Sequence, residues 1–315
     1  MDLDRATLEA AHCWERADVA PGQPQLTAFR RRLRFHQAQW REANGHPIGS
    51  QPIVPQDGKP ARLLGSRIPL EYARTTGANF LTPAAREAVE ARLAVKEPHQ
   101  LIDTQRLWAD LLSSMPMCFN LFGDFAADLP LADRAVHTWW PGSPGEVVDV
   151  RFEHSPGRLD PAYLGNRSAF DVAFILDLAD DAKGIVGVET KYHELAKAET
   201  AKPSRLAAYQ RVAEASGIFV ADVMDAVNGT SLLQIWLDHL LLLSMLQHED
   251  RRWGWGRFVI VYPQGNSDFA DACRQYQALL VDPSTFAAVT IEELLDAGVL
   301  PDGSAATFRH RYLPT

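Results

Sequence analysis

The chain has 315 residues, of which 46% are hydrophobic and 23% are charged. These are ordinary values for a globular protein, so they exclude wholesale disorder and leave room for one elaborated domain or two small ones. The formal net charge of −9 gives no overall attraction to a polyanion, so nucleic-acid binding would require a local basic surface.

The first hundred residues predict helices joined by an irregular linker. Residues 24–45 place apolar side chains on one stripe and arginines largely off it, which predicts an amphipathic, locally basic helix. Its arginines fit either a solvated face or contacts with a DNA backbone. Prolines and glycines interrupt any regular period over residues 45–69, so we expect an irregular linker there. Thr82 and Pro83 then predict the start of a helix that extends to about Lys96.

A long helix facing the core is expected next. Apolar residues recur at close to helical spacing over residues 101–112, and the pattern breaks near Pro116. The apolar segment 117–123 is typical of buried packing beneath a site and carries no evident chemistry of its own.

The pattern changes after Gly145 to that of β-strands. Residues 147–153 alternate apolar and charged side chains, which predicts a half-buried strand. Two further strands are expected at residues 170–177 and 184–191, separated by a turn-like segment at 179–183. The short connection favours an antiparallel arrangement of these strands.

The rest of the chain predicts helices around one more buried strand. Helices are expected at residues 203–215 and 232–247, followed by a strand at 257–262. Two more helices are expected between residues 268 and 297, with a short strand and helix cap at 289–292. The core order is therefore helix, three strands, helix and strand.

Acidic and basic residues meet where two of the predicted strands lie side by side. Asp171 opens one strand, and Glu189 and Lys191 lie near the end of the next, on the same face because strand side chains alternate. Two carboxylates supply the hard oxygen ligands that suit Mg²⁺. Lys191 could hold or deprotonate an attacking water, or stabilise charge on a phosphate. This combination indicates phosphodiester hydrolysis, although a lysine–carboxylate pair on a sheet can also be purely structural.

The order of elements and this spacing resemble the PD-(D/E)XK nuclease-like superfamily. A closer resemblance, from about Gly65 to Pro263, is to a group of restriction-endonuclease-like proteins. It rests on Ser113-Ser-Met-Pro-Met-Cys-Phe-Asn-Leu-Phe-Gly123, Arg167-Ser-Ala-Phe-Asp171 and Val188-Glu-Thr-Lys-Tyr-His-Glu194. The resemblance implies an α/β fold with an αβββαβ core, a mixed central sheet and added N-terminal helices. It also implies a nuclease core at 99–265, with a helical region and linker packed on it at 1–98 and a helical extension at 266–315.

The resemblance further implies a DNA substrate and dependence on Mg²⁺, for which Mn²⁺ can substitute. Asp171, Glu189 and the backbone carbonyl of Thr190 would be metal ligands, and Lys191 the catalytic lysine. Phe170 stands where a proline is common before the aspartate, a variation that leaves the metal argument intact.

Several neighbouring residues are further candidates for the site. Two of them, Glu153 and Asp110, are candidates for additional metal ligands. The candidates for supporting or substrate-binding roles are Arg167, Ser168, His193, Glu194 and Gln234. Glu153 fits a partly exposed strand-end acid equally well, and Arg167 fits an ion pair that holds its loop. His193 could be an ordinary hydrogen-bonded loop residue, and Gln234 a satisfied residue at a helix border.

We interpret the chain as a metal-dependent endonuclease acting on DNA, with a role in restriction or anti-phage defence that rests on the resemblance alone. One alternative is an inactive nuclease fold that binds nucleic acid. Another is a protein-interaction component of a defence complex, for which Trp139-Trp140 and Trp253-Gly-Trp255 would offer apolar surface. The sequence lacks a Gly-rich phosphate loop, so no nucleotide cofactor is expected. A homodimer is plausible because one metal site cuts one strand.

The sequence also predicts a cytoplasmic protein. Its longest apolar run, residues 240–246, is far shorter than the roughly 20 residues that span a bilayer, so no membrane partner is expected. Residues 1–5 are acidic and lack the apolar stretch of a secretory signal. Cys13, Cys118 and Cys273 are isolated and odd in number, which argues against a disulfide framework or a cysteine-rich zinc site.

Overall fold

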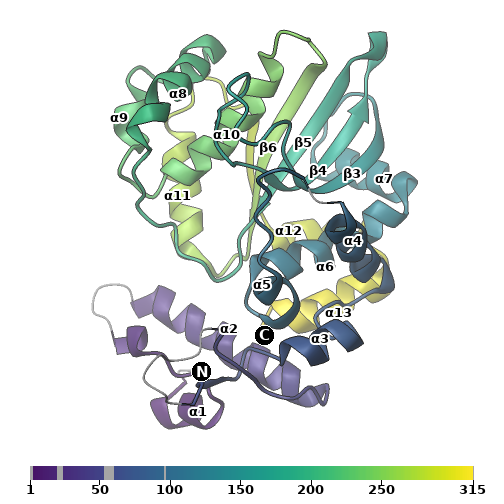
Figure 1. Ribbon diagram of the computed structural model, residues 1–315, viewed down its shortest axis with the longest axis vertical. Helices are drawn as coiled ribbons and strands as arrows, with labels where there is room; N and C mark the ends of the chain where they lie inside the picture. Colours follow the sequence, from purple (N-terminus) through teal and green to yellow (C-terminus); the bar gives the residue numbers. More distant parts are fainter. Residues whose placement is uncertain (1–2, 20–23, 53–59, 96, 315) are drawn as a thin grey trace. The chain divides into compact units, whose positions relative to one another are not determined.

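A five-stranded mixed sheet organises the part of the chain that carries the predicted strands (Figure 1). The computed structural model describes residues 3–19, 24–52, 60–95 and 97–314. In the order in which they lie side by side, the strands are β3 (Glu146–His154), β4 (Phe170–Asp177), β5 (Lys183–Thr190), β6 (Trp253–Tyr262) and β7 (Phe286–Thr290).

The first three strands form the predicted antiparallel meander. Phe152 pairs with Val172, and Val172 in turn pairs with Val188. β6 runs parallel to β5, and β7 runs parallel to β6. A parallel pair needs a long crossover, which here consists of α8 (Pro203–Ser216), α9 (Val223–Val227) and α10 (Leu233–Leu246). The α/β fold and the mixed central sheet are therefore confirmed.

The chain divides into two compact units, each assembled from separate segments. Unit 1 contains residues 1–87, 102–123 and 301–315, and unit 2 contains residues 88–101 and 124–300 with the whole five-stranded sheet. The helices and short strands of unit 1 are α1 (Arg5–Ala10), η1 (Arg16–Val19), α2 (Pro24–Ala43), β1 (Gly49–Ser50), β2 (Leu63–Leu64), α3 (Leu70–Thr76), α5 (Thr104–Ala109) and α13 (Asp302–Tyr312). Two helices, α4 (Pro83–Ala94) and α6 (Ser114–Ala127), extend across the division. The three predicted regions, 1–98, 99–265 and 266–315, stay a prediction.

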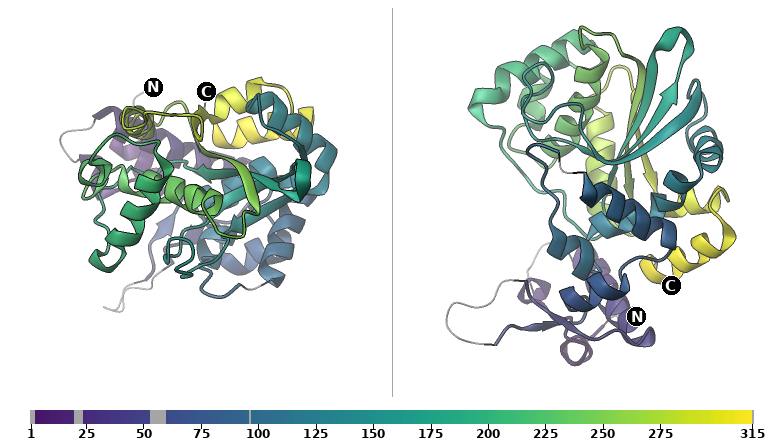
Figure 2. Two further views of the ribbon diagram at one scale, coloured as in Figure 1. Left: turned by 90° about the horizontal axis from the view of Figure 1, so that it is seen from above. Right: turned by 45° about the vertical axis from the view of Figure 1, so that its right-hand side comes forward.

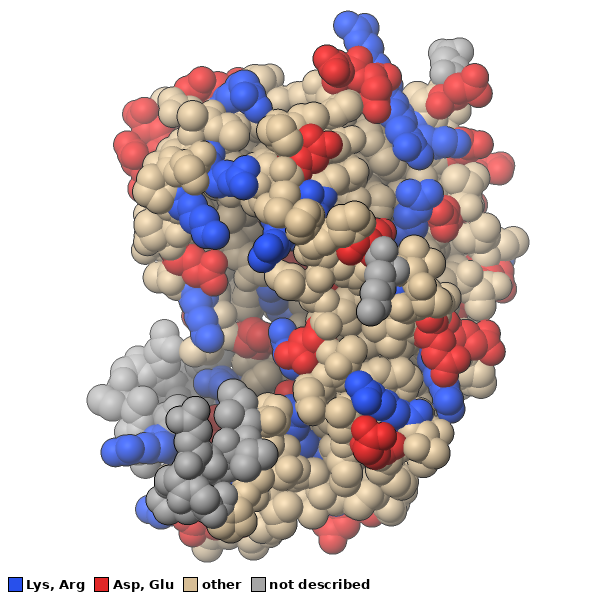
Figure 3. Space-filling model, viewed as in Figure 1, with Lys and Arg blue, Asp and Glu red and all other residues tan. Residues whose placement is uncertain are grey.

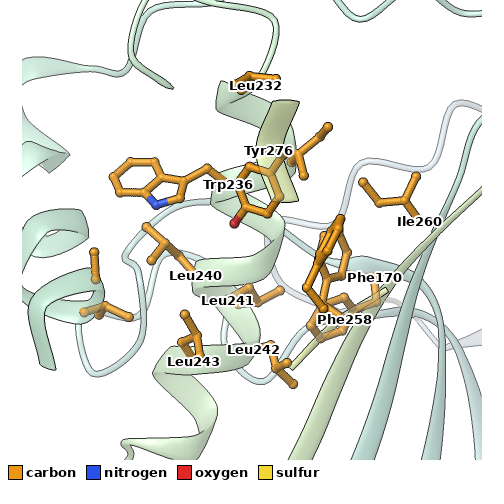
Figure 4. Packing of buried hydrophobic residues seen from close by; sticks show 14 of the residues in the cluster. Phe170, Leu232, Trp236, Leu240, Leu241, Leu242, Leu243, Phe258, Ile260 and Tyr276 are labelled. Atoms are coloured by element: carbon orange, nitrogen blue, oxygen red, sulfur yellow. The ribbon is translucent and has the colours of Figure 1, made fainter. Parts of the chain in front are cut away.

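Helices cover both faces of the sheet in unit 2 (Figure 2). On one face, α10 turns Leu241 and Leu242 toward Phe258 of β6, and Phe170 of β4 belongs to the same buried cluster (Figure 4). Trp236 lies on the other side of α10, edge-on to Tyr209 of α8. Tyr276 of α11 (Ser267–Gln277) completes this buried cluster. The apolar sequence of α10 thus follows from its position between the sheet and the outer helices.

The opposite face of the sheet is covered by α7 (Leu129–Trp139) and α12 (Ile291–Asp296). Trp140 lies edge-on to Phe174 of β4, with the ring centroids 5.9 Å apart. Trp139 Nε1 donates to the carbonyl of Leu294 in α12 at 3.0 Å. Trp140 is 2% exposed and Trp253 is 5% exposed, so both residues belong mainly to the core rather than to an apolar surface.

The arginines of α2 mostly stabilise unit 1. Arg34 is 2% exposed and donates to both carboxylate oxygens of Asp18. Arg31 donates to the carbonyl of Asp18, and Arg41 donates to the carbonyls of Gly65 and His46. The predicted helix is confirmed, and these three side chains are occupied within the unit rather than presented to a DNA backbone.

The helix expected at residues 101–112 is shorter than predicted. It is α5, which begins after Asp103, whose side chain accepts from the amides of Gln105 and Arg106. It ends before Asp110, which has extended backbone and forms an isolated bridge with Arg67. The apolar pattern continues beyond the helix because Leu111 and Leu112 are buried although they lie outside α5.

Other predicted boundaries also differ from those observed. Pro116 does not end a helix but lies in the first turn of α6, where the missing amide hydrogen is tolerated. Gly49 and Leu64 pair within the predicted linker, whose residues 53–59 lie outside those described. The strand and cap expected at 289–292 are β7 and the capping box of Thr290 at the start of α12. None of the described helices combines the length and apolar character that a bilayer crossing requires.

Candidate active site

Asp171 and Glu189 come together at one end of the β4–β5 pair. The pairing of Val172 with Val188 sets them side by side, as the antiparallel arrangement predicted. Asp171 Oδ2 accepts hydrogen bonds from the backbone amide of Thr190 at 2.8 Å and from its hydroxyl at 2.6 Å. Thr190 therefore holds the Asp171 carboxylate through both its backbone amide and its hydroxyl. Simple alternation of strand faces did not predict the contact with the hydroxyl.

Lys191 and Glu189 form a largely buried ion pair. Lys191 Nζ lies 2.7 Å from Glu189 Oε1, and the two side chains are 10% and 11% exposed. The same Glu189 oxygen accepts from Gln234 Nε2 of α10 at 3.1 Å. Gln234 thus supports the Glu189 carboxylate directly.

Burial and mutual repulsion dominate the electrostatics of this pair of acids. Burial raises the pKa of Asp171, although hydrogen bonds from Thr190 oppose the shift. Burial and the charge of Asp171 raise the pKa of Glu189 well above its usual range. Burial opposes the charge on Lys191, but the adjacent Glu189 carboxylate outweighs it and raises the pKa of Lys191. Lys191 is therefore held as an ammonium, which suits charge stabilisation better than proton abstraction.

Asp238 is a site residue that the sequence reasoning missed. It lies on α10 one turn after Gln234, is 7% exposed and lines the same cavity as Asp171 and Glu189. Burial raises its pKa to about 7, Lys191 lowers it, and Asp171 raises it further. The available signal was the four-residue spacing of Gln234 and Asp238 on a mostly apolar helix, which places them on one face.

His239, the neighbour of Asp238, is structural. Its ring nitrogens lie 2.9 Å from the hydroxyl of Tyr276 and 2.9 Å from that of Thr285. Burial lowers the pKa of His239 to about 3. The imidazole is therefore a neutral, hydrogen-bonded core residue.

Glu153 lies near Asp171 but is tied to an arginine. Arg158 donates to the Glu153 carbonyl at 2.8 Å and to its carboxylate at 3.3 Å, and it also pairs with Glu97. Burial and the charge of Asp171 raise the pKa of Glu153 to about 7, against the effect of Arg158. Glu153 lines the cavity and remains a candidate ligand, whereas the Arg158 side chain is only 3% exposed and is engaged by the two glutamates.

Asp110 belongs to unit 1, where Arg67 Nη1 donates to its carboxylate at 2.9 Å. It caps a short helix rather than lying within one, and its role as a ligand stays a prediction.

His193 and Glu194 follow the end of β5. Glu194 accepts from the Tyr192 amide at 2.7 Å, and its carbonyl accepts from Asn266. His193 is half-buried and contacts the Tyr192 ring. Neither residue is among those that line the cavity, but the charge of Glu194 contributes to raising the pKa values of Asp171 and Lys191. Their roles in the site stay a prediction.

A cavity of about 780 Å³ joins the carboxylates to basic residues of unit 2. Arg167 and Ser168 line it as predicted, together with Lys202 and Arg205 at the start of α8, which the sequence reasoning missed. Arg167 and Lys202 are exposed, and none of the described ion pairs involves either residue or Arg205. Lysine and arginine side chains are visible over this part of unit 2 in Figure 3. The cavity therefore offers basic side chains for phosphate contacts beside the acidic residues that also line it.

The donor set fits a divalent ion that keeps most of its waters. Among the residues the structure describes, no three histidine, cysteine or acidic side chains form a preassembled metal cluster. Mg²⁺ commonly uses only one or two carboxylates and retains several waters. Asp171 Oδ1 and Glu189 Oε2 take part in none of the described hydrogen bonds, so each carboxylate keeps an oxygen available for an ion.

Comparison with known proteins gives one result that covers most of the chain. The family model of the PD-(D/E)XK nuclease superfamily matches residues 24–314. No curated protein and no solved structure matches the chain.

Proposed function

Because the chain belongs to the PD-(D/E)XK nuclease superfamily, we propose that it is a divalent-metal-dependent endonuclease that hydrolyses phosphodiester bonds in DNA. The observation that carries this proposal is the convergence of Asp171, Glu189 and Lys191 on one end of the β4–β5 pair. A role in restriction or anti-phage defence would fit such an activity.

Asp171 and Glu189, together with the carbonyl of Thr190, would hold Mg²⁺ or Mn²⁺. A bound ion lowers the pKa of its water and offsets charge on the phosphate. Thr190 keeps one oxygen of Asp171 in place, and Gln234 does the same for Glu189. The two ligands are thus preorganised, which reduces the cost of forming the site.

Lys191 would stabilise negative charge that develops on the phosphate. Its ammonium lies against Glu189 Oε1, while the other oxygen of Glu189 is available for the ion. A fixed positive group that is largely shielded from water stabilises developing charge more strongly than one in water. This role requires no proton transfer from a lysine whose pKa is raised.

Arg167, Lys202 and Arg205 would contact phosphates on either side of the one that is cleaved. They line the same cavity as the carboxylates, and contacts with phosphates position a nucleic acid without reading its sequence. Homodimerisation would allow both strands of a duplex to be cut.

Cleavage of supercoiled plasmid tests the proposal. Wild-type protein is assayed with Mg²⁺, Mn²⁺ or EDTA beside Asp171→Asn and the matched control Asp177→Asn, which changes an exposed acid at the other end of β4. We expect metal-dependent cutting that is lost in Asp171→Asn and kept in Asp177→Asn. Wild-type binding of DNA without cutting would instead support the inactive-fold alternative, and neither binding nor cutting would support an interaction component.

A further inference from the structure

Asp238 is a buried acid with one carboxylate oxygen that has no hydrogen-bond partner in the described part of the chain. The residue is 7% exposed, and Asp238 Oδ2 is buried without a hydrogen-bond partner among the described residues. Burial of a carboxylate oxygen is costly unless a donor or a cation compensates it. This oxygen therefore indicates a ligand that the protein chain itself does not supply.

Two donors of the site, Lys191 and Gln234, are already engaged by Glu189. Lys191 Nζ donates to Glu189 Oε1, and Gln234 Nε2 donates to the same oxygen. No described ion pair joins Lys191 to Asp238. The side chain of Asp238 nevertheless lines the cavity together with Asp171 and Glu189.

Gln234 and Asp238 are one turn apart on α10, so the helix presents both to the same cavity. Gln234 acts on the site by a direct hydrogen bond to Glu189. Asp238 lies on α10, whereas Asp171 and Glu189 lie side by side on the β4–β5 pair. A water molecule on an ion held by those two carboxylates would supply the donor that Asp238 Oδ2 lacks.

We propose that Asp238 is a positioning residue for the divalent ion, and that its Oδ2 accepts a hydrogen bond from a water molecule bound to that ion. The inference rests on the proposed function, because it requires an ion held by Asp171 and Glu189. Mg²⁺ retains several waters, and outer residues that orient ligands typically change metal affinity 10- to 100-fold when they are replaced. α10 would thus orient one protein ligand through Gln234 and one water ligand through Asp238.

Calorimetric titration of Mn²⁺ into the metal-free full chain tests this inference without reliance on activity. Asp238→Asn keeps the shape of the side chain and removes its charge. We expect a single ion bound by wild type and a dissociation constant about 10- to 100-fold larger in Asp238→Asn. Asp238→Ala should show the same loss of affinity. This second variant is included because the asparagine amide could itself form a hydrogen bond with the water molecule.

Glu199→Gln is the matched control, since Glu199 is exposed and lines the same cavity. If this variant weakens Mn²⁺ binding as much as Asp238→Asn does, general charge and not position is responsible, and the inference is wrong. Unchanged affinity in Asp238→Asn would also overturn it. The inference would also be wrong if wild type bound two ions and Asp238→Asn bound one, because Asp238 would then coordinate an ion directly.

Failure of the inference and failure of the proposed function give different results. If Asp171→Asn abolishes Mn²⁺ binding while Asp238→Asn leaves it intact, the metal site stands and only the role of Asp238 falls. If wild type binds neither Mn²⁺ nor Mg²⁺, the metal dependence of the proposed function falls, and the inference falls with it.

Discussion

Replacement of Asp238 by asparagine should stabilise the metal-free protein, and the gain should grow with pH. Burial raises the pKa of Asp238 from 3.8 to about 7. Because the folded-state pKa is raised, the folded protein binds the proton more tightly than the unfolded chain. The stabilisation that this proton gives is present below pH 4 and is lost as pH rises toward 7. Asparagine is uncharged throughout this pH range, so the variant does not lose this stabilisation as the pH rises.

The magnitude follows from the shift. A difference of about 3 pKa units, at about 1.4 kcal/mol per unit, gives an upper limit of about 4 kcal/mol at pH 8. Near pH 4 the difference between Asp238→Asn and wild type should almost vanish, because the carboxyl group is then protonated in the folded protein. Loss of metal affinity would therefore accompany a gain in metal-free stability, as expected of a residue kept for function.

Urea unfolding of EDTA-treated protein, followed by tryptophan fluorescence at several pH values between 4 and 8, measures this difference. Trp236 is fully buried on the same helix as Asp238 and should report the unfolding of unit 2. Asp225→Asn, which changes an exposed acid on α9, is the control and should show no gain that grows with pH. A difference for Asp238→Asn that is absent at pH 8, or that shrinks as pH rises, would refute the reasoning from burial.

Two further predictions concern the substrate and the core. Arg167→Ala should lower the slope of log affinity for DNA against log salt by about 1, as for one lost phosphate contact. Arg151→Ala, at an exposed pair with Asp149, should leave that slope unchanged; equal slopes for wild type and Arg167→Ala would contradict the contact. The depressed pKa of His239, about 3 because of burial, means that its neutral form stabilises the fold above about pH 6.5 and that this contribution is lost as pH falls toward 3. The free energy of unfolding should therefore fall by about 2 kcal/mol less in His239→Gln than in wild type when the pH is lowered from 7 to 5. An equal fall in the two proteins would disprove this prediction.

The strands and the central acids could be predicted because their geometry is local. The apolar runs over residues 170–177 and 184–191 and the short turn between them indicated the pairing that β4 and β5 form. That pairing by itself places Asp171 beside Glu189 and Lys191. The two carboxylates and the lysine could thus be assembled from the chain alone.

Contacts made across elements distant in sequence could not be predicted in this way. Asp238 faces the cavity because α10 packs on β6 at one particular rotation, and an acid on an apolar helix does not show which neighbour it meets. The bridge between Arg67 and Asp110 likewise ends α5 early, through a partner 43 positions away. Lys202 and Arg205 reach the cavity only because the crossover returns α8 beside the sheet.

The role of Lys191 is the central claim, and single-turnover cleavage of DNA in Mg²⁺ by Lys191→Met tests it most directly. Methionine keeps much of the length of the side chain and removes its charge. Lys183→Met makes the same change at the start of β5, where the lysine is partly exposed and pairs with Asp177. We predict loss of cleavage by at least about 100-fold in Lys191→Met, the scale for removal of one stabilising group at a reacting centre, with DNA binding retained and Lys183→Met fully active. Cleavage at the wild-type rate by Lys191→Met would show that the nuclease acts without this lysine and would contradict the account.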